Sequence, residues 1–402
     1  MRVLILTHRL PYAPNRGDRI RAFHLVKALA ASHDVTLVSL TDDLGDLQLA
    51  GELRAGLAGL EAFRRPVRRN VVRAMLRLGG RTPLTHLLLD APALDACLAR
   101  GHLAAPDVVI AYCTGIAPVA LRPPLMSAPL LLDMVDVDSE KWRSLAMRAR
   151  GPRRWIYARE ARLLSRFEAH VAGRASVITV VSERERDALH RLNPAARIEV
   201  VPNGVDLEEF APSAGPSAEP LVVFVGVMNY APNVDGAQWL VNDVWPLVTA
   251  RVPSARLALV GADPARAVSA LAGPSVEVTG SVPDVRPWLW RASVAAAPLR
   301  TARGLQNKVL EALAAGLPVV ATSSVVEGLP AGCRSACTLA DEAPAFAESV
   351  VKALMADPRE RREAALGALP PTYAWPRRME RFVQLVQEIG SGSYSSGARI
   401  SQ

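Results

Sequence analysis

The chain has 402 residues, of which 50% are hydrophobic and 21% are charged. This apolar content excludes a disordered protein, and the length is enough for two domains of roughly 200 residues, each with its own core. The formal charge of +8 favours anionic partners such as phosphorylated ligands, acidic lipid surfaces or nucleic acid. Nucleic-acid binding has no supporting motif, because the sequence contains neither a helix-turn-helix nor a zinc-finger pattern.

The cysteines and the apolar runs indicate a cytoplasmic protein. The four cysteines are Cys97, Cys113, Cys333 and Cys337. They form no C-x-x-C pair, and no histidine stands near them at metal-ligand spacing, so reduced thiols are the simplest interpretation. No signal peptide is visible, and the longest apolar stretch, 108–121, is too short to span a bilayer. We expect a soluble protein, or one attached peripherally to the inner face of the plasma membrane.

Short β-branched or leucine-rich runs alternate with helical patterns along the chain. In the first half the expected strands are 3–6, 35–40, 108–111, 130–132, 177–181 and the start of 197–206, and the expected helices are 20–31, 44–60 and 92–100. In the second half the expected strands are 221–225, 255–260, 276–279, 294–298 and 317–322, and the expected helices are 234–252, 305–316, 344–356 and 374–389. The alternation predicts parallel, doubly wound α/β sheets.

The alternation occurs twice, on either side of a linker rich in Pro, Ala, Ser and Gly at 211–220. The sequence therefore predicts two tandem Rossmann-like domains with a ligand cleft between them, and ligands in such sheets bind at the carboxyl ends of the strands. The expected division is domain one at 1–205, domain two at 206–372, a final helix at 373–389, and a disordered Gly- and Ser-rich tail at 390–402.

The turn that opens the helix of the second half carries Arg300, Arg303, Gly304 and Lys308. Free N–H groups at a helix N-terminus attract anions, and the three cations strengthen this field, so a diphosphate fits here. Glu311 lies one turn beyond Lys308 and can hold a pair of sugar or ribose hydroxyls. The alternative is an ordinary i,i+3 ion pair on a solvated face, although the surrounding residues are apolar.

The loop after the first strand, residues 8–21, lacks a G-x-G-x-x-G pattern, which disfavours a nicotinamide dinucleotide site. Gly17 allows close approach to a ligand, and Asp18 is a candidate N-cap. Three arginines either face an anionic ligand or are exposed loop residues: Arg16, Arg19 and Arg21.

Three acids follow the strand at 130–132: Asp133, Asp136 and Asp138. They could coordinate Mg²⁺, hold sugar hydroxyls or act as a base. The alternative is a turn with Asx caps, and the spacing does not match an EF-hand. A further turn at 278–286 contains Gly280 and Val282, whose backbone groups could contact a nucleobase edge.

Two stretches, 64–81 and 143–174, are basic and amphipathic. Cationic helices with an apolar face suit an anionic membrane surface. The alternative for each stretch is an ordinary surface helix in an arginine-rich protein.

Taken together, these motifs resemble the GT-B glycosyltransferases of the group-1 (GT4-like) family over nearly the whole chain. The resemblance rests on VPNGVD at 201–206, LVVFVG at 221–226, LALVG at 257–261, VTGSVPDV at 278–285 and above all LEALAAGLPVVAT at 310–322. Within the family the chain looks most like the sugar transferases of exopolysaccharide and PEP-CTERM (exosortase) loci, on RLPYAPNRGDR at 9–19, DVDSEKW at 136–142 and ARGLQNK at 302–308.

The resemblance implies sugar transfer from a nucleotide-diphospho-sugar, with retention and without an essential metal or other cofactor. It also implies a C-terminal helix that crosses back to the first domain, which 373–382 matches. The family often carries a Glu-x7-Glu pair, but Arg303 stands at the first position here and Glu311 at the second. The stretch after Gly226 lacks the usual cations, and Asp136 stands near the place of a family histidine.

On this resemblance the residues take three expected roles. Donor contacts are expected from Gly17, Arg19, Gly226, Gly280, Val282, Arg300, Arg303, Gly304, Leu305, Gln306, Asn307, Lys308 and Glu311. Catalytic roles are expected for Asp136, Lys308 and Glu311, with Lys308 neutralising phosphate and Glu311 holding the ribose. Acceptor or sugar contacts are expected from Asp133, Asp136 and Asp138, and no metal ligands are expected.

The expected activity is transfer from a UDP- or GDP-type donor to a growing, lipid-linked exopolysaccharide glycan, with a polyprenyl-linked acceptor and contact with an anionic membrane. Two alternatives stay open. One is a nucleotide-sugar 2-epimerase on the same fold. The other is a non-catalytic relative that binds membranes or polyanions.

Overall fold

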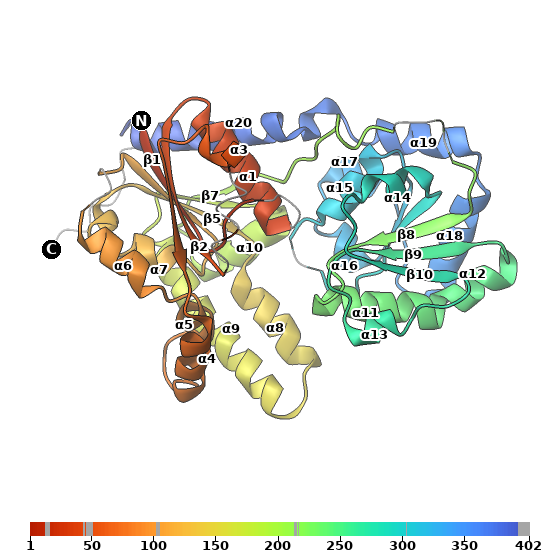
Figure 1. Cartoon of the computed structure of the whole chain (residues 1–402), viewed down its shortest axis with the longest axis horizontal. Helices are drawn as coiled ribbons and strands as arrows, with labels where there is room; N and C mark the ends of the chain where they lie inside the picture. The colour runs from red at the N-terminus through yellow and green to blue at the C-terminus, as the bar shows by residue number, and fades with distance from the viewer. Residues whose placement is uncertain are drawn as a thin grey trace. The chain divides into compact units, whose positions relative to one another are not determined.

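The computed structural model describes residues 1–12, 17–42, 45, 51–101, 105–212, 215, 217–302 and 304–392. It divides into two compact units: unit 1 is Met1–Val201 with the chain from Arg378 on, and unit 2 is Pro202–Arg377 (Figure 1). The expected boundaries at 205 and 373 differ from these by a few residues. The reason is that Val205 pairs with Ala374 in an isolated bridge, which ties both segments to unit 2.

Within the described residues, unit 1 is built on a parallel sheet of seven strands in the order β3-β2-β1-β4-β5-β6-β7. The strands are β1 Arg2–Thr7, β2 Asp34–Thr41, β3 Gly59–Arg64, β4 Val108–Tyr112, β5 Leu130–Val135, β6 Val177–Val180 and β7 Ile198–Val200. All residues of β4 and β6 are buried, as expected for a parallel sheet covered on both faces, which selects continuous apolar runs rather than alternation.

The helices of unit 1 connect these strands. They are α1 Gly17–Ala30, α3 Gly51–Arg54, α4 Val67–Leu76, α5 Leu84–Leu88, α6 Pro92–Ala99, α7 Ala117–Ala120, η1 Leu125–Ser127, α8 Asp138–Arg148, α9 Gly151–Ala172 and α10 Glu183–Leu192. Strand order reverses between the neighbours β1 and β4, and this reversal is the point where doubly wound sheets bind ligands.

The helix expected at 44–60 is wrong in its second half. Residues Gly59–Arg64 form β3, which pairs in parallel with β2 at the edge of the sheet. An edge strand is only partly covered, and β3 has no fully buried residue. Its sequence therefore lacks the apolar run that identifies the central strands. Residues 44 and 46–50 of the expected helix lie outside the described residues.

Unit 2 contains, in the part of the chain that is described, a parallel sheet of six strands in the order β10-β9-β8-β11-β12-β13. The strands are β8 Leu221–Val225, β9 Arg256–Val260, β10 Val276–Gly280, β11 Val294–Ala297, β12 Val319–Ala321 and β13 Cys337–Leu339. Here the order reverses between β8 and β11, which are paired. These two sheets confirm the predicted α/β fold of two Rossmann-like domains.

The helices assigned to unit 2 are α11 Ala231–Trp239, η2 Leu240–Val244, α12 Trp245–Arg251, α13 Arg266–Ser269, α14 Arg286–Arg291, α15 Asn307–Ala314, α16 Ser323–Val326, α17 Ala331–Arg334, α18 Ala343–Met355, α19 Pro358–Gly367 and η3 Pro371–Tyr373. The single helix expected at 234–252 is divided by the π-helical turn η2. The sequence did not predict α19.

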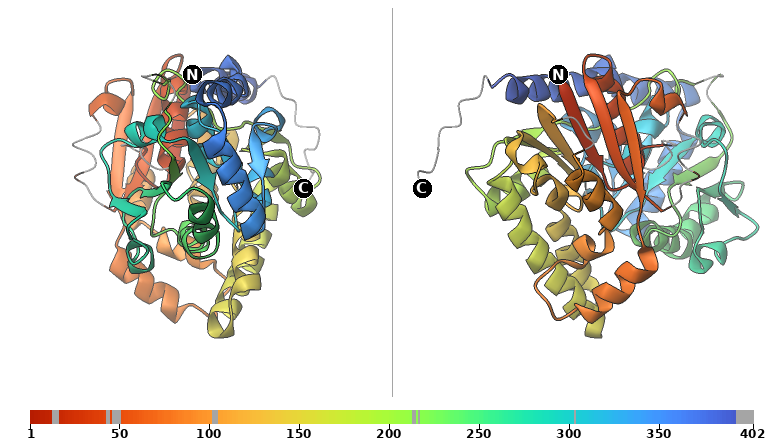
Figure 2. Two further views of the ribbon diagram at one scale, coloured as in Figure 1. Left: turned by 90° about the vertical axis from the view of Figure 1, so that its right-hand side faces the viewer. Right: turned by 60° about the vertical axis from the view of Figure 1, so that its left-hand side comes forward.

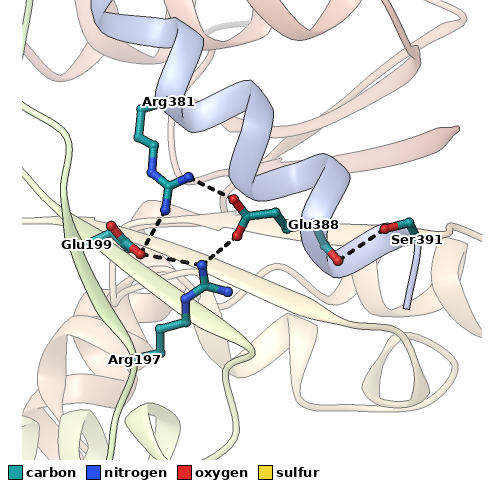
Figure 3. A network of polar contacts seen from close by, with 5 residues as sticks. All are labelled: Arg197, Glu199, Arg381, Glu388 and Ser391. Atoms are coloured by element: carbon teal, nitrogen blue, oxygen red, sulfur yellow. Dashed lines mark hydrogen bonds and ion pairs between the residues drawn. The ribbon is translucent and has the colours of Figure 1, made fainter. Parts of the chain in front are cut away.

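The last helix, α20 Trp375–Gly390, belongs to unit 1 from Arg378 on. A four-residue network fixes it beside β7 (Figure 3): Arg381 donates to Glu199 and Glu388, and Arg197 donates to the same two carboxylates. The hydrogen bonds from the two arginines hold the pKa of Glu388 below its ordinary value. The end of α20 packs so closely on Met1 and Val108 that a Cβ at Gly390 would lie within 3 Å of both side chains. Of the tail expected at 390–402, Gly390 instead ends α20, and residues 393–402 lie outside the described residues.

Helix α4 and the α8–α9 pair project from one end of unit 1 (Figures 1 and 2). Two adjacent charged residues of α9 hold this projection together. Arg159 donates to the carbonyls of Gly80 and Thr82 after α4, and Glu160 accepts from the N–H groups of Leu84 and Thr85. Both charged side chains are buried. In the described part of the chain, no helix is both long enough and apolar enough to cross a membrane.

Candidate functional site

In unit 2, the candidate site lies at the carboxyl ends of β8 and β11, where the strand order reverses. The backbones of the turns after β8 and β9 are in direct contact. A Cβ on Gly261, whose φ is 144°, would lie 1.9 Å from the Gly226 carbonyl oxygen. Only glycine fits there, so two of the glycines that end strands bring neighbouring turns together at this edge.

Lys308, in the first turn of α15, extends to the end of β8. Its Nζ donates to Asn233 Oδ1 at 2.9 Å, lies 4.8 Å from the centre of the Phe224 ring, and would be 3.1 Å from a Cβ on Gly226. Burial lowers the pKa of Lys308 to about 7, and the attraction of Glu311 only partly opposes this. A cavity of about 10 Å³ beside the lysine is otherwise lined by apolar residues and supplies no counter-charge. The ammonium is thus held in place with no hydrogen bond to a carboxylate of the described residues, which suits an anionic ligand.

Glu311 lies one turn further along α15 and is partly buried. Burial raises the pKa of Glu311 to about 7, with Lys308 opposing the rise and Glu209 adding to it. Glu209 itself is paired with Arg286 at 3.1 Å. Among the described residues, no hydrogen bond to the Glu311 carboxylate is observed, so its oxygens remain available to hydroxyl donors.

The turn before α15 presents further donors. Asn307 accepts a hydrogen bond from Asn203 at 2.7 Å through its Oδ1, whereas its Nδ2 has no acceptor among the described residues. The Oγ1 atom of Thr301 likewise lacks a partner in the described ranges. Gly304, at φ 60°, packs its carbonyl oxygen against Gly328, where a Cβ would come within 2.2 Å. The close approach at Gly304 is thus between two backbone segments, and its contact with a ligand stays a prediction.

The remaining predicted donor residues of unit 2 are distributed around this edge. Arg300 is paired with Asp235 of α11, so part of its charge is neutralised. Leu305 is buried, whereas Gln306 is partly buried and is the N-cap residue of α15. Gly280 ends β10 and Val282 follows it, partly buried. Arg303 lies outside the described residues.

In unit 1, Asp133 has a structural role that the sequence did not predict. Its carboxylate accepts from Arg21 Nε at 2.8 Å and Nη2 at 3.0 Å, and from Thr179 at 2.9 Å. Both charged side chains are fully buried. The predictions of a sugar contact for Asp133 and of a ligand-facing or exposed position for Arg21 are therefore wrong, because these groups satisfy each other inside the unit.

Asp136 and Asp138 lie in the turn after β5, beyond the buried pair. Asp138 is partly buried beside Thr114, and burial raises its pKa against the attraction of Lys141 and His8. Two non-glycine residues with positive φ flank this edge: Val135 at 61° and Cys113 at 73°, at the ends of the paired strands β5 and β4. Strained backbone of this kind is concentrated at functional sites, and it is unusual for a β-branched residue.

Two buried carboxylates fix the same turn from other helices. Glu185 of α10 accepts from the Val137 N–H at 2.7 Å, and Glu168 of α9 accepts from the Ser139 N–H at 3.0 Å. Burial raises the pKa of Glu168 to about 7. Since α8 begins at Asp138, these acids hold the helix N-terminus and set the direction of the Asp136–Asp138 segment.

The other predicted contacts of unit 1 lie on α1. Gly17 is its first residue and is exposed. Arg19 donates to the Tyr12 carbonyl at 2.9 Å, so it fixes the entry to the loop after β1. Arg16 and the side chain of Asp18 lie outside the described part of the chain. Among the residues that are described, no group of three His, Cys, Asp or Glu could hold a metal ion.

Comparison with known families decides the class of protein to which these sites belong. Residues 17–204 match the family model "Glycosyl transferase 4-like domain", and residues 219–356 match the family model "Glycosyl transferases group 1". The chain is a group 1 glycosyltransferase of GT-B type. A search of curated proteins finds no match.

Solved structures share the fold of this glycosyltransferase at low sequence identity. The Anabaena protein Alr3699/HepE in complex with UDP is 14% identical, with 96% of this chain and 100% of that chain covered and a TM-score of 0.64. TarM is 11% identical, with 96% and 98% covered and a TM-score of 0.65. The trehalose-phosphate synthase (UDP-forming) of Burkholderia vietnamiensis is 14% identical, with 96% and 100% covered and a TM-score of 0.63.

Sequence reasoning missed several residues that position the glycosyltransferase sites. Asn233 orients Lys308 from α11, and its Nδ2 also donates to the Val227 carbonyl at 2.9 Å. Glu168 and Glu185 hold the α8 N-terminus from helices that read as ordinary amphipathic segments. The available sequence signal for the two acids was a charged residue at a helical position expected to be buried, because a buried polar group needs a buried partner.

Proposed function

We propose that this glycosyltransferase takes its sugar from a UDP- or GDP-type nucleotide-diphospho-sugar bound by unit 2. The position of Lys308 carries the proposal: a partly buried ammonium held by Asn233 beneath Gly226, at the reversal point of the sheet. The free backbone N–H groups at the start of α15 supply further contacts for a diphosphate, as does the Nδ2 of Asn307, which has no acceptor among the described residues. Glu311 would then accept from the ribose hydroxyls.

The structural neighbours favour the uridine form of the donor. Structures of HepE contain UDP, UDP with glucose, or UDP-glucose, and the trehalose-phosphate synthase is named as UDP-forming. We therefore propose UDP as the first nucleotide to test, with GDP second.

In the proposed reaction the protein contributes mainly position and charge. Lys308 and the α15 N-terminus stabilise the negative charge that develops on the departing diphosphate. Asp136 and Asp138 stand on a turn that two buried carboxylates hold rigidly, and we propose that they orient acceptor or sugar hydroxyls. Retention of configuration at the anomeric carbon belongs to the same proposal, and NMR analysis of the product linkage would test it.

Titration calorimetry with Lys308→Met tests the donor site. We expect the variant to bind UDP at least about tenfold more weakly than the wild type, with uridine binding changed far less, since a charged hydrogen bond contributes roughly 1.5–3 kcal/mol. Lys352→Met is the matched control, because Lys352 is an exposed lysine of α18 and we expect it to bind UDP like the wild type. Equal losses of UDP and uridine binding in Lys308→Met would contradict the phosphate role.

We also propose that the acceptor is a growing, lipid-linked exopolysaccharide glycan, and that unit 1 contacts an anionic membrane through α4. This helix buries Asn70 and Ala74 but exposes a row of apolar side chains. The row consists of Val67, Val71, Val72, Met75 and Leu76, with exposed fractions of 47%, 41%, 51%, 63% and 83%. The sequence 64–81 around it contains seven arginines and no acid. An exposed apolar face flanked by cations suits the surface of an anionic bilayer.

Vesicle co-sedimentation tests the membrane contact. Met75→Ser with Leu76→Ser should reduce binding to vesicles rich in phosphatidylglycerol, whereas Leu366→Ser, an exposed leucine of α19, should not. Equal binding by both variants would contradict the role of α4.

Incubation of the donor without acceptor separates transfer from 2-epimerisation, because an epimerase converts its donor alone.

A further inference from the structure

A groove lies between α8 and α9 in unit 1. These two helices belong to the projection that also carries α4, which Figure 2 shows. Its volume is about 470 Å³, within the usual range for ligand sites. It is lined by Arg143, Ala146, Met147, Arg154, Ala158, Ala161, Arg162, Ser165 and Arg166. The walls therefore combine guanidinium groups with small apolar side chains.

Three of the four arginines that line this groove have no carboxylate partner among the described residues. Arg154, Arg162 and Arg166 are exposed and make no ion pair with any described residue, whereas Arg143 of α8 is paired with Glu140. Three uncompensated guanidinium groups around one hollow favour a multiply charged anion.

The spacing of the arginines puts two of them within reach of one diphosphate. Arg162 and Arg166 are one helical turn apart on α9, a rise of about 6 Å, and Arg154 lies about 12 Å before Arg162. Arg162 and Arg166 can therefore both contact one diphosphate, whereas Arg154 lies further along the same groove. The guanidinium fork binds phosphate oxygens in pairs, which adds geometric selection.

The floor of the groove is apolar. Ala146 and Ala161 are buried, and Met147 is 74% exposed beside them. The hairpin is fixed by the packing of Trp142 on Tyr157, with ring centres 5.3 Å apart, and by the Glu168 contact at the start of α8. A preformed hollow with cationic walls and an apolar floor suits an amphiphile that has an anionic head group and a hydrocarbon chain.

We propose that the α8–α9 groove binds the diphosphate head group of an isoprenoid-diphosphate lipid, which would be the carrier part of the acceptor. The inference rests on the proposed function only in treating this lipid as part of the acceptor. The arginines bind the two phosphates, and the apolar floor receives the first isoprene units.

The test measures farnesyl diphosphate binding by titration calorimetry at physiological salt. The groove variant combines Arg154→Gln, Arg162→Gln and Arg166→Gln. The control variant combines Arg150→Gln, Arg153→Gln and Arg174→Gln, which are exposed arginines outside the groove and remove the same charge. We expect the groove variant to bind at least about tenfold more weakly and the control to stay within about twofold of the wild type. Circular dichroism of both variants verifies folding.

Three outcomes would overturn the proposal. Equal weakening in both variants would show attraction to net charge rather than a site. Inorganic pyrophosphate binding as tightly as farnesyl diphosphate would show a simple anion site without a lipid chain. If the groove variant binds phosphatidylglycerol vesicles more weakly than the wild type but binds farnesyl diphosphate equally well, the groove is a bilayer contact. UDP binding by the wild type is measured separately, so a failed donor site can be distinguished from a failed groove.

Discussion

UDP binding should weaken as the pH rises above 7, because Lys308 must be charged to bind a diphosphate. Burial lowers the pKa of Lys308 from 10.5 to about 7 in the unliganded chain. A bound diphosphate stabilises the ammonium and raises this pKa again, so binding above pH 7 takes up a proton. The affinity for UDP therefore falls as the pH increases.

The size of the effect follows from the two pKa values at this site. Between pH 7.0 and 8.5 the charged fraction of a lysine with a pKa near 7 falls about 16-fold. Burial raises the pKa of Glu311 to about 7, so this carboxylate becomes fully ionised over the same interval. The contribution of ribose binding to the affinity then increases about twofold. The net loss for UDP is about eightfold, whereas uridine, which needs only Glu311, should bind about twofold more tightly.

Titration calorimetry of both ligands at pH 7.0 and 8.5 measures these changes directly. Repeating the titrations in buffers of different ionisation enthalpy counts the protons taken up. Lys308→Met should bind UDP weakly at both pH values and lose the eightfold decrease. A wild-type affinity for UDP that stays constant or increases from pH 7.0 to 8.5 would refute the reasoning, as would an unchanged decrease in the methionine variant.

Three further predictions concern the parts of the fold that position the sites. Gly261→Ala should lower the free energy of unfolding by about 3 kcal/mol or more, because the new Cβ overlaps the Gly226 carbonyl. The control Gly273→Ala should change it little, because a Cβ there meets nothing within 4 Å. Equal urea midpoints for the two variants would contradict this. Arg21→Met should cost about 3–5 kcal/mol by leaving Asp133 charged and buried, and adding Asp133→Leu should recover much of this loss in urea denaturation; a double variant no better than the single one would be evidence against the ion-pair explanation. The folded-state pKa of Glu168, about 7, exceeds its ordinary value of 4.5, so its contribution to stability is complete below pH 4.5 and is lost as the pH rises through 7. Glu168→Gln should therefore show a smaller drop in melting temperature between pH 5 and 8 than the wild type, and parallel curves would argue against this titration.

The sequence by itself determined the central strands and the turn chemistry. Strands such as β4 and β8 are continuous apolar runs because parallel sheets are covered on both faces, and this pattern can be read without a structure. The glycines at 226, 261 and 280 mark strand ends. At Gly226 and Gly261 neighbouring turns meet too closely for a side chain, and at Gly280 the φ of 69° favours glycine. Lys308 could be selected as a phosphate contact because it stands at a helix start in apolar surroundings.

The tertiary structure alone decided which charged groups are available to a ligand. Asp133 lies inside β5 and Asp138 three residues beyond its end, and only Asp133 is fully paired, with Arg21 from α1, a residue 112 positions away in the chain. The edge strand β3 and the contacts of Asn233, Glu168 and Glu185 likewise depend on partners that are distant in sequence. Hydrophobic periodicity shows which faces of a helix or strand are buried. The partner of a buried charge, in contrast, depends on which distant segments the fold brings beside it.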